Sequence, residues 1–300
     1  MSHHLKSVDP KILGLARPTD EEQAVGLQNM VLSQSDPGYH INWNYLAASA
    51  PPWFSRELLV GLRRAHLRLL DEIAGQPATE NRYQIMASDR AGVFSLGGDL
   101  GLMAAAIRQG DRQSVARYAH LCLDLVLQLV DSGRRNLTSI ALVQGAAMGG
   151  GFEAALAHEY IVAERGVRFG FPEVHFNLFP GMGAYTLLKR RVGEAMAENM
   201  IVSGHTYSAE ALHELGVVNM LAEPGNGVDA ALLLVRKLES RASGARAFRR
   251  AVRCNHEADR AEMVSILNAW IDQAMTLSER DLRTMDFMRR SQLHKLSLAS

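Results

Sequence analysis

Apolar residues recur along this chain with two different spacings, and the pattern predicts strands that alternate with helices. Between Ser55 and Gly75, leucines return every three or four residues, which predicts an amphipathic helix capped by the Ser55 hydroxyl. Short apolar runs at 41–45, 83–87 and 140–143 predict strands, and the last is continuous enough to be covered on both faces. This alternation is typical of a layered α/β protein.

The rest of the chain extends the pattern. Helices are predicted over 100–110, 111–133, 149–158, 182–191, 194–202 and 208–215. Two further strands are predicted over 160–163 and 216–221, and helices follow over 230–241, 245–255, 259–276 and 279–292. We therefore expect an irregular N-terminal segment (1–40), an α/β core (41–225) and a C-terminal helical region (226–300).

Composition and charge narrow the class of protein. The chain has 300 residues with 47% hydrophobic and 21% charged residues, as in ordinary globular proteins. Its formal net charge is zero, so no overall basic field indicates nucleic-acid binding. Two cysteines provide neither a disulfide framework nor a CxxC metal site. We expect no membrane span, no signal peptide and a cytoplasmic location.

Two glycine-rich turns are the first candidates for chemistry. Gly98 lies in a Gly-Gly-Asp turn and Gly150 in a Gly-Gly-Gly turn, each between an apolar segment and a predicted helix. Glycines at such turns present unhindered backbone N–H groups. Two N–H groups that converge on one point would form an oxyanion hole, which stabilises negative charge on a carbonyl oxygen.

Two carboxylates accompany these turns. Glu153 lies three residues after Gly150, and Glu173 follows Pro172 among apolar neighbours. Apolar surroundings raise the pKa of a carboxyl group toward neutrality, where it takes and gives protons. A lone glutamate is more often a helix cap or an ion-pair partner. The combination of both glutamates with both turns favours acid–base chemistry on an acyl group.

The motifs around these residues resemble a known superfamily. The Gly-Gly-Asp turn, the Gly-Gly-Gly-x-Glu turn and the later Pro-Glu pair resemble the enoyl-CoA hydratase/isomerase, or crotonase, superfamily. Longer motifs resemble the diffusible signal factor synthases within it over about residues 50–290. These motifs are Leu96-Gly-Gly-Asp-Leu, Ser139-Ile-Ala-Leu-Val-Gln-Gly, Gly149-Gly-Gly-Phe-Glu-Ala-Ala-Leu, Leu178-Phe-Pro-Gly-Met-Gly-Ala-Tyr, Tyr207-Ser-Ala-Glu, Trp270-Ile-Asp-x-Ala-Met and Leu282-Arg-Thr-Met-Asp.

This resemblance implies a fold, a reaction and partners. The fold would be a crotonase-like spiral of strand–strand–helix units with C-terminal helices, and the chain would assemble as a homo-oligomer, with a trimer as the implied state. The substrate would be a 3-hydroxyacyl thioester on the phosphopantetheine of acyl carrier protein. Dehydration would give a cis-2-enoyl thioester, and hydrolysis would release the free acid as a quorum-sensing signal. Gly98 and Gly150 would bind the oxyanion, Glu153 and Glu173 would be catalytic, and no metal or other cofactor is implied.

A fatty acyl chain also requires an apolar pocket. The predicted acyl-binding residues are Met148, Phe152, Met182, Trp270 and Met275. For the methionines, ordinary core packing is an equally good interpretation.

Two other functions stay open at this point. A CoA-dependent enoyl hydratase is one, although Ser95-Leu96 differs from the small residues expected beside an adenine pocket. A non-catalytic regulator that binds a sensor histidine kinase is the other, and the intact glutamate pair argues against it. A serine peptidase of related fold is disfavoured, because the chain has no G-x-S-x-G motif.

Overall fold

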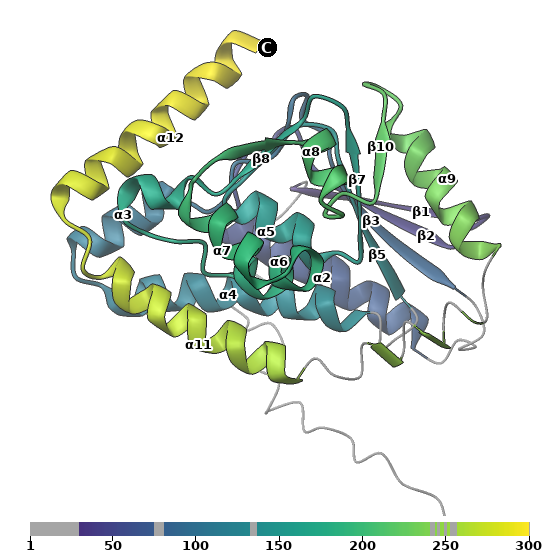
Figure 1. Cartoon of the computed structure of the whole chain (residues 1–300), viewed down its shortest axis with the longest axis horizontal. Coiled ribbons are helices and arrows are strands. Elements are labelled where there is room, and N and C mark those ends of the chain that lie inside the picture. The colour runs from purple at the N-terminus through teal and green to yellow at the C-terminus, as the bar shows by residue number, and fades with distance from the viewer. Residues whose placement is uncertain are drawn as a thin grey trace, which may run out of the picture.

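Two β-sheets and a layer of helices form the framework of the protein (Figure 1). The computed structural model describes residues 30–74, 81–132, 137–240, 244, 247–248, 251–252 and 257–299. The strands are β1 (Val31–Asp36), β2 (Ile41–Leu46), β3 (Arg82–Ser88), β4 (Val93–Ser95), β5 (Leu137–Val143), β6 (Ala146–Met148), β7 (Tyr160–Glu164), β8 (Arg168–Gly170), β9 (Thr206–Ser208) and β10 (Met220–Ala222).

Helices connect and cover these strands. They are α2 (Arg56–Ile73), α3 (Leu100–Arg108), α4 (Arg112–Asp131), α5 (Gly150–Ala157), the short 3₁₀ helix η2 (Pro172–Phe176), α6 (Ala184–Val192), α7 (Glu194–Val202), α8 (Ala209–Glu214), α9 (Gly227–Glu239), α11 (Glu257–Ala274) and α12 (Glu279–Ala299).

The larger sheet has the strand order β1-β2-β3-β5-β7-β10 and divides the core. Successive side chains of a strand point to opposite faces. Ile85 and Ile140 accordingly pack with α9 on one face. Their neighbours Met86 and Ala141 join the main core with α2, α4 and α5 on the other face. Covering on both faces explains why the middle strands are continuous apolar runs.

The smaller sheet has the order β4-β6-β8-β9. The first three strands run parallel, and β9 pairs antiparallel with β8. Each of the three parallel strands has three residues, so none forms a long periodic pattern in the sequence.

The C-terminal helices return to the core and pack on earlier elements. α11 lies along α4 and α6, and α12 crosses α3 and η2 before it extends from the body of the molecule (Figure 1). The guanidinium of Arg108 on α3 pairs with Glu279 and Asp286 of α12. These contacts fasten the last part of the chain to the region before α4.

Most predicted elements agree with the structure, but two predictions need correction. Residues 1–40 were expected to be irregular, whereas Val31–Asp36 forms β1, which pairs antiparallel with β2. β1 is an edge strand with mostly exposed polar side chains, so it has no apolar signal. The strand predicted over 216–221 is limited to β10.

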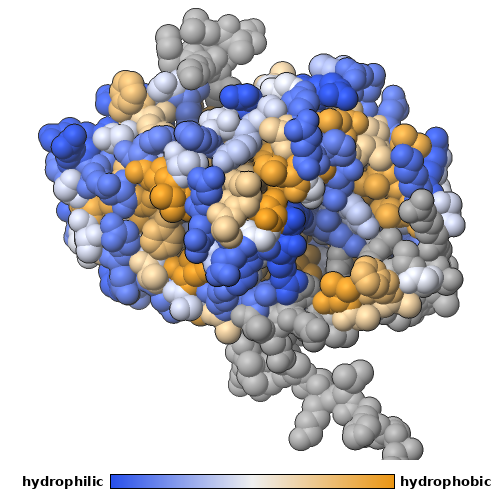
Figure 2. All heavy atoms as spheres, in the orientation of Figure 1, coloured by the Kyte–Doolittle hydropathy of each residue, from blue (hydrophilic) through white to orange (hydrophobic). Residues whose placement is uncertain are grey.

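Other predictions lie beyond what the structure describes. Residues 1–29, the proposed helix ends at Gly75 and Gly133, and most of the predicted helix 245–255 lie outside the described residues. On the face drawn in Figure 2, hydrophobic residues form separate patches among polar ones. In the described part of the chain, no helix combines the length and apolar character required to cross a membrane.

Candidate active site

Three neighbouring strands of the smaller sheet each lead to one part of the candidate site. Because β4, β6 and β8 run parallel, their carboxyl ends lie at one edge of the sheet. β4 leads to Gly98 before α3, and β6 leads to Gly150 and to Glu153 on α5. β8 leads to Glu173 in η2. The topology thus brings together residues that are far apart in the sequence.

The two glycine turns pack directly against each other. A Cβ atom on Gly97, where φ is +100°, would lie 2.8 Å from the carbonyl oxygen of Met148. A Cβ atom on Gly150 would lie 3.3 Å from the amide nitrogen of Gly98. Among the described residues, no acceptor is found for the N–H groups of Gly98 and Gly150. Both donors are therefore available to an oxygen atom of a ligand.

Glu153 is held by the start of α6. Its side chain is 2% exposed, and Oε1 accepts hydrogen bonds from the N–H groups of Met182 at 2.7 Å and Ala184 at 3.3 Å. The N-cap residue Gly183 has no side chain that could accept them, so the glutamate caps this helix. Burial raises the pKa of Glu153 to about 7, although the two N–H groups oppose the rise.

Glu173 lies against the other glycine turn. Its Oε1 would be 2.5 Å from a Cβ atom on Gly149, so a side chain at that position would push the carboxyl group aside. Its Oε2 is shielded from solvent and finds no hydrogen-bond partner in the described part of the chain. Burial raises the pKa of Glu173 to about 8, and the negative charge of Glu153 contributes to the rise.

The two carboxyl groups differ in their hydrogen bonds. Glu153 receives two backbone N–H groups, which stabilise its ionised form, whereas the shielded oxygen of Glu173 has no such donor within the described residues. These contacts favour an ionised Glu153 and a protonated Glu173. A pair that holds one proton near neutral pH contains one acid and one base.

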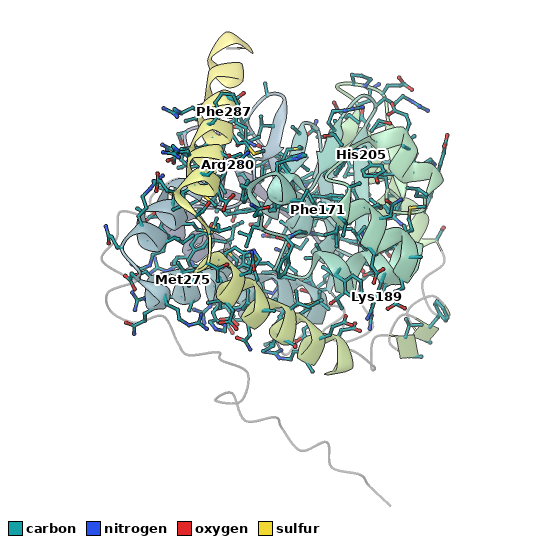
Figure 3. The ribbon with its side chains drawn as sticks, turned by 60° about the vertical axis from the view of Figure 1, so that its left-hand side comes forward. Phe171, Lys189, His205, Met275, Arg280 and Phe287 are labelled. Carbon is teal, nitrogen blue, oxygen red and sulfur yellow. The ribbon has the colours of Figure 1, made fainter. Side chains whose placement is uncertain are left out.

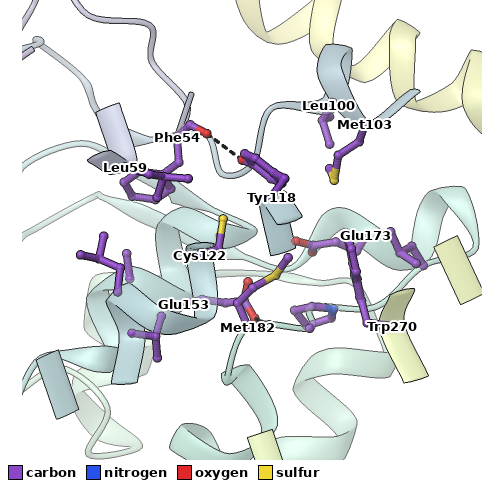
Figure 4. A pocket seen from close by; sticks show the side chains of 18 of the residues that line it. Phe54, Leu59, Leu100, Met103, Tyr118, Cys122, Glu153, Glu173, Met182 and Trp270 are labelled. Atoms are coloured by element: carbon purple, nitrogen blue, oxygen red, sulfur yellow. Dashed lines mark hydrogen bonds between the residues drawn. The ribbon is translucent and has the colours of Figure 1, made fainter. Parts of the chain in front are cut away.

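An apolar pocket lies beside these groups (Figure 4). Gly98, Gly150, Glu153 and Glu173 all line it. Its apolar lining comprises Phe54, Leu59, Met86, Leu100, Met103, Leu125, Val126, Leu129, Phe176, Leu178, Met182 and Trp270. Such a lining suits a hydrocarbon chain whose functional group faces the carboxylates.

The structure places two of the five predicted acyl-binding residues, Met182 and Trp270, in the lining of this pocket. The other three lie outside that lining. The ring of Phe152 stacks on another aromatic ring in the core. Met148 lies in β6, and Met275 lies in the connection between α11 and α12 (Figure 3).

The wall formed by the C-terminal helices depends on close contacts. The ring of Trp270 covers Gly181 so closely that any Cβ atom there would overlap the indole. Nearby, the amide of Gln273 donates to the carbonyl of Asn177 at 3.1 Å, and the Asn177 amide donates to Asp281 at 2.7 Å. Asn177 ends η2 in the left-handed conformation, so α11 and α12 fix the segment that carries Glu173.

Several lining residues were not anticipated from the sequence. Phe54, Met86, Tyr118 and Cys122 all reach the pocket. Cys122 lies on the apolar face of the helix that begins after Asp111, so the apolar pattern of that helix indicated that Cys122 faces the interior. No pattern in the sequence distinguished a helix face that packs on protein from one that lines a cavity.

Comparison with known proteins identifies the family. The profile of the enoyl-CoA hydratase/isomerase family matches residues 77–280. The chain belongs to this family. The α/β crotonase fold is its architecture.

Individual members of the enoyl-CoA hydratase/isomerase family match parts of the chain. The mevalonyl-coenzyme A hydratase of Beauveria bassiana is 46% identical over 94 residues, which are 31% of this chain and 34% of the relative. The short-chain-enoyl-CoA hydratase of Clostridium acetobutylicum is 34% identical over 121 residues, which are 39% of this chain and 46% of the relative. The matched part is thus less than half the length of both curated relatives.

Solved structures match more of the chain at lower identity. Pseudomonas aeruginosa DspI is 25% identical with a TM-score of 0.65, and the match covers 82% of this chain and 88% of DspI. Human mitochondrial delta3-delta2-enoyl-CoA isomerase is 21% identical with a TM-score of 0.72, and the match covers 89% of this chain and 99% of the isomerase. The likeness to the human isomerase shows the fold alone.

Proposed function

We propose that this chain dehydrates a 3-hydroxyacyl thioester carried on acyl carrier protein to the cis-2-enoyl thioester, and then hydrolyses the thioester to a free unsaturated acid. One observation carries the proposal: the buried Glu153, the partly buried Glu173 and two backbone N–H groups line one apolar pocket, and neither N–H group has an acceptor among the described residues. The motifs that resemble diffusible signal factor synthases support the finer assignment of the product as a quorum-sensing signal.

Dehydration requires a base and an acid on adjacent carbons. In the proposed assignment Glu173 takes the proton from the carbon next to the thioester carbonyl. The N–H groups of Gly98 and Gly150 stabilise the enolate oxygen, and Glu153 protonates the departing hydroxyl group, which leaves as water. The hydrogen bonds of the structure favour a proton on Glu173 and an ionised Glu153, which is the opposite distribution. Exchange of the two roles is therefore the alternative assignment.

Hydrolysis uses the same groups. An ionised Glu153 takes a proton from a water molecule, whose oxygen attacks the thioester carbonyl carbon. The two glycine N–H groups stabilise the oxyanion of the tetrahedral intermediate. The C–S bond then breaks, and the thiolate takes the proton that Glu153 received from water as the acid is released. The hydrogen bonds that hold Glu153 in its ionised form support this step.

The pocket must widen before a long acyl chain binds. Its cavity measures about 70 Å³, against roughly 300–1,000 Å³ for typical ligand pockets. Flexible methionine side chains form part of the wall at Met86, Met103 and Met182. Because methionine has several rotatable bonds, these side chains are the ones we expect to move.

The deciding experiment compares two carriers. The purified protein is incubated with the same 3-hydroxyacyl group on acyl carrier protein and on CoA, and the products are identified by mass spectrometry. Release of the free cis-2-enoic acid from the carrier protein supports the proposal. Glu153→Gln and Glu173→Gln should each abolish that release. An unchanged rate in the double variant would refute the site.

Exchange of hydrogen with solvent separates the two role assignments. In heavy water, the residue that takes the proton exchanges deuterium into the carbon next to the thioester carbonyl. If Glu173 is that residue, Glu173→Gln loses the exchange and Glu153→Gln keeps it. The opposite result assigns the base to Glu153.

A CoA-dependent enoyl hydratase is the second candidate, favoured by the names of the two curated relatives. Reversible hydration of a 2-enoyl-CoA without release of free acid would support it. Absence of turnover with either carrier would leave a non-catalytic regulator that binds a sensor histidine kinase.

We also expect a homo-oligomer, with a trimer as the resemblance implies. Phe287 is 65% exposed on α12, where that helix leaves the body of the molecule, and this exposed ring supports an interface there (Figure 3). Light scattering after gel filtration measures the state, and a monomer at micromolar concentration would contradict the expectation.

A further inference from the structure

A hydroxyl group is inserted into the backbone contact that holds the first glycine turn. Phe54 and Gly98 form an isolated parallel bridge. One bond of the bridge is direct, because the N–H of Phe54 donates to the carbonyl of Gly97 at 2.8 Å. The second bond of such a bridge would run from the N–H of Asp99 to the carbonyl of Phe54.

The Tyr118 hydroxyl occupies the place of that second bond. It accepts a hydrogen bond from the N–H of Asp99 at 2.8 Å and donates one to the carbonyl of Phe54 at 2.7 Å (Figure 4). It also lies 3.4 Å from the position of a Cβ atom on Gly98. The hydroxyl therefore satisfies both strand groups and sets the distance between them.

These contacts determine where the Gly98 N–H points. In a trans peptide the C=O and the following N–H point in opposite directions. The carbonyl of Gly97 is directed to Phe54, so the N–H of Gly98 is directed away from Phe54. The next N–H along the chain, that of Asp99, is held by Tyr118. Peptide groups on both sides of the Gly98 Cα are thus fixed.

We propose that Tyr118 is a positioning residue that orients the Gly98 N–H for the developing oxyanion. This inference rests on the proposed function, because it assumes that Gly98 binds the thioester oxygen. Tyr118 acts through the backbone of residues 97–99, and its hydroxyl has both hydrogen-bonding roles occupied by protein groups.

The surroundings suit a fixed hydroxyl. Tyr118 is 5% exposed, and α4 holds its ring among core residues. Burial also keeps the pKa of Tyr118 well above 10, so the hydroxyl remains both donor and acceptor. Replacing Tyr118 by phenylalanine would leave the ring in place and remove both hydrogen bonds.

Turnover with the 3-hydroxyacyl carrier protein provides the first test. We expect Tyr118→Phe to lower kcat about 10- to 100-fold, because a small displacement of an oxyanion donor has effects of this order. KM should change by less than about threefold, since no contact to the substrate is removed. The control is Tyr185→Phe, whose hydroxyl bonds the exposed Glu194, and it should retain the wild-type kcat.

A spectroscopic test separates this role from a general loss of structure. The carbonyl stretch of a medium-chain 2-enoyl pantetheine thioester, isotope-labelled at the carbonyl, is recorded when the thioester is bound to Glu153→Gln, which lacks the base proposed for hydrolysis. Polarisation by the two N–H groups should shift this band to lower frequency. Adding Tyr118→Phe should reduce the shift, while adding Tyr185→Phe should not.

The outcomes distinguish the two proposals. A bound thioester without any shift in Glu153→Gln would overturn the oxyanion site, and with it the role of Tyr118. A shift that Tyr118→Phe leaves unchanged, together with an unchanged kcat, would overturn the positioning role alone. A loss of kcat with an unchanged shift would also contradict it.

Discussion

Replacement of Glu173 by glutamine should stabilise the protein, and the gain should increase with pH. The pKa of Glu173 is raised from 4.5 to about 8 by burial and by the charge of Glu153. Its unfolded form releases the proton near pH 4.5, whereas its folded form keeps it until about pH 8. Rising pH therefore favours the unfolded state across this interval.

The size of the effect follows from the same two values. Each pH unit between them costs the folded state about 1.4 kcal/mol, so the upper limit is about 5 kcal/mol. Part of the Glu173 side chain reaches solvent, which screens its charge. We expect a gain of about 2–3 kcal/mol for Glu173→Gln at pH 9 after this screening. Below pH 4.5 both side chains are neutral, and the gain should vanish.

Urea unfolding of both proteins between pH 4 and 9 measures this difference. The control is Glu198→Gln, an exposed carboxyl on α7 whose replacement should shift the unfolding free energy by less than about 0.5 kcal/mol at every pH. A difference between Glu173→Gln and wild type that stays constant across the range would refute the reasoning. It would mean that Glu173 ionises near pH 4.5 in the folded protein.

Three further predictions concern activity. Gly181→Ala should displace Trp270 and raise KM at least about tenfold, and indole fluorescence reports the displacement. Gly244→Ala, whose added Cβ has no atom of the described residues within 4 Å, should change neither quantity. Asn177→Gly keeps the left-handed backbone but removes the hydrogen bond to Asp281. We expect kcat to fall severalfold with little change in the urea midpoint of unfolding. An unchanged kcat would contradict the role of this hydrogen bond in holding η2. The pH dependence of kcat/KM should be bell-shaped and centred near neutral pH, because the carboxylate pair works with one proton; limbs near pH 4 alone would contradict it.

Much of the fold could be predicted from the sequence, because long helices and buried strands have strong periodic signals. Ser55 caps its helix as predicted, and Asp111 and Ser208 cap the helices predicted to begin at these residues, each with a side chain that accepts a backbone hydrogen bond. Short elements escaped prediction. β6 and β8 have three residues each and take their stability from pairing with neighbours rather than from local pattern.

Part of the candidate site could be predicted because some of its residues belong to local sequence motifs. Glycine turns and paired glutamates are local features, and the structure brings Gly98, Gly150, Glu153 and Glu173 to one pocket. The pocket wall is a tertiary property. Phe152 and Met182 are both apolar residues close to a glycine, yet only Met182 lines the pocket. Side-chain direction in the folded state decides such cases, and spacing along the chain does not reveal it.

The packing of α11 and α12 has a consequence for biosynthesis. A ribosome releases the N-terminal part of a chain first, so both glycine turns and both glutamates emerge before Trp270, Gln273 and Asp281. Until then the pocket lacks one wall, and η2 lacks the contacts that hold it. A nascent or C-terminally truncated chain would therefore expose an apolar cavity to water, and such a chain would be a target for chaperones rather than an early form of the enzyme.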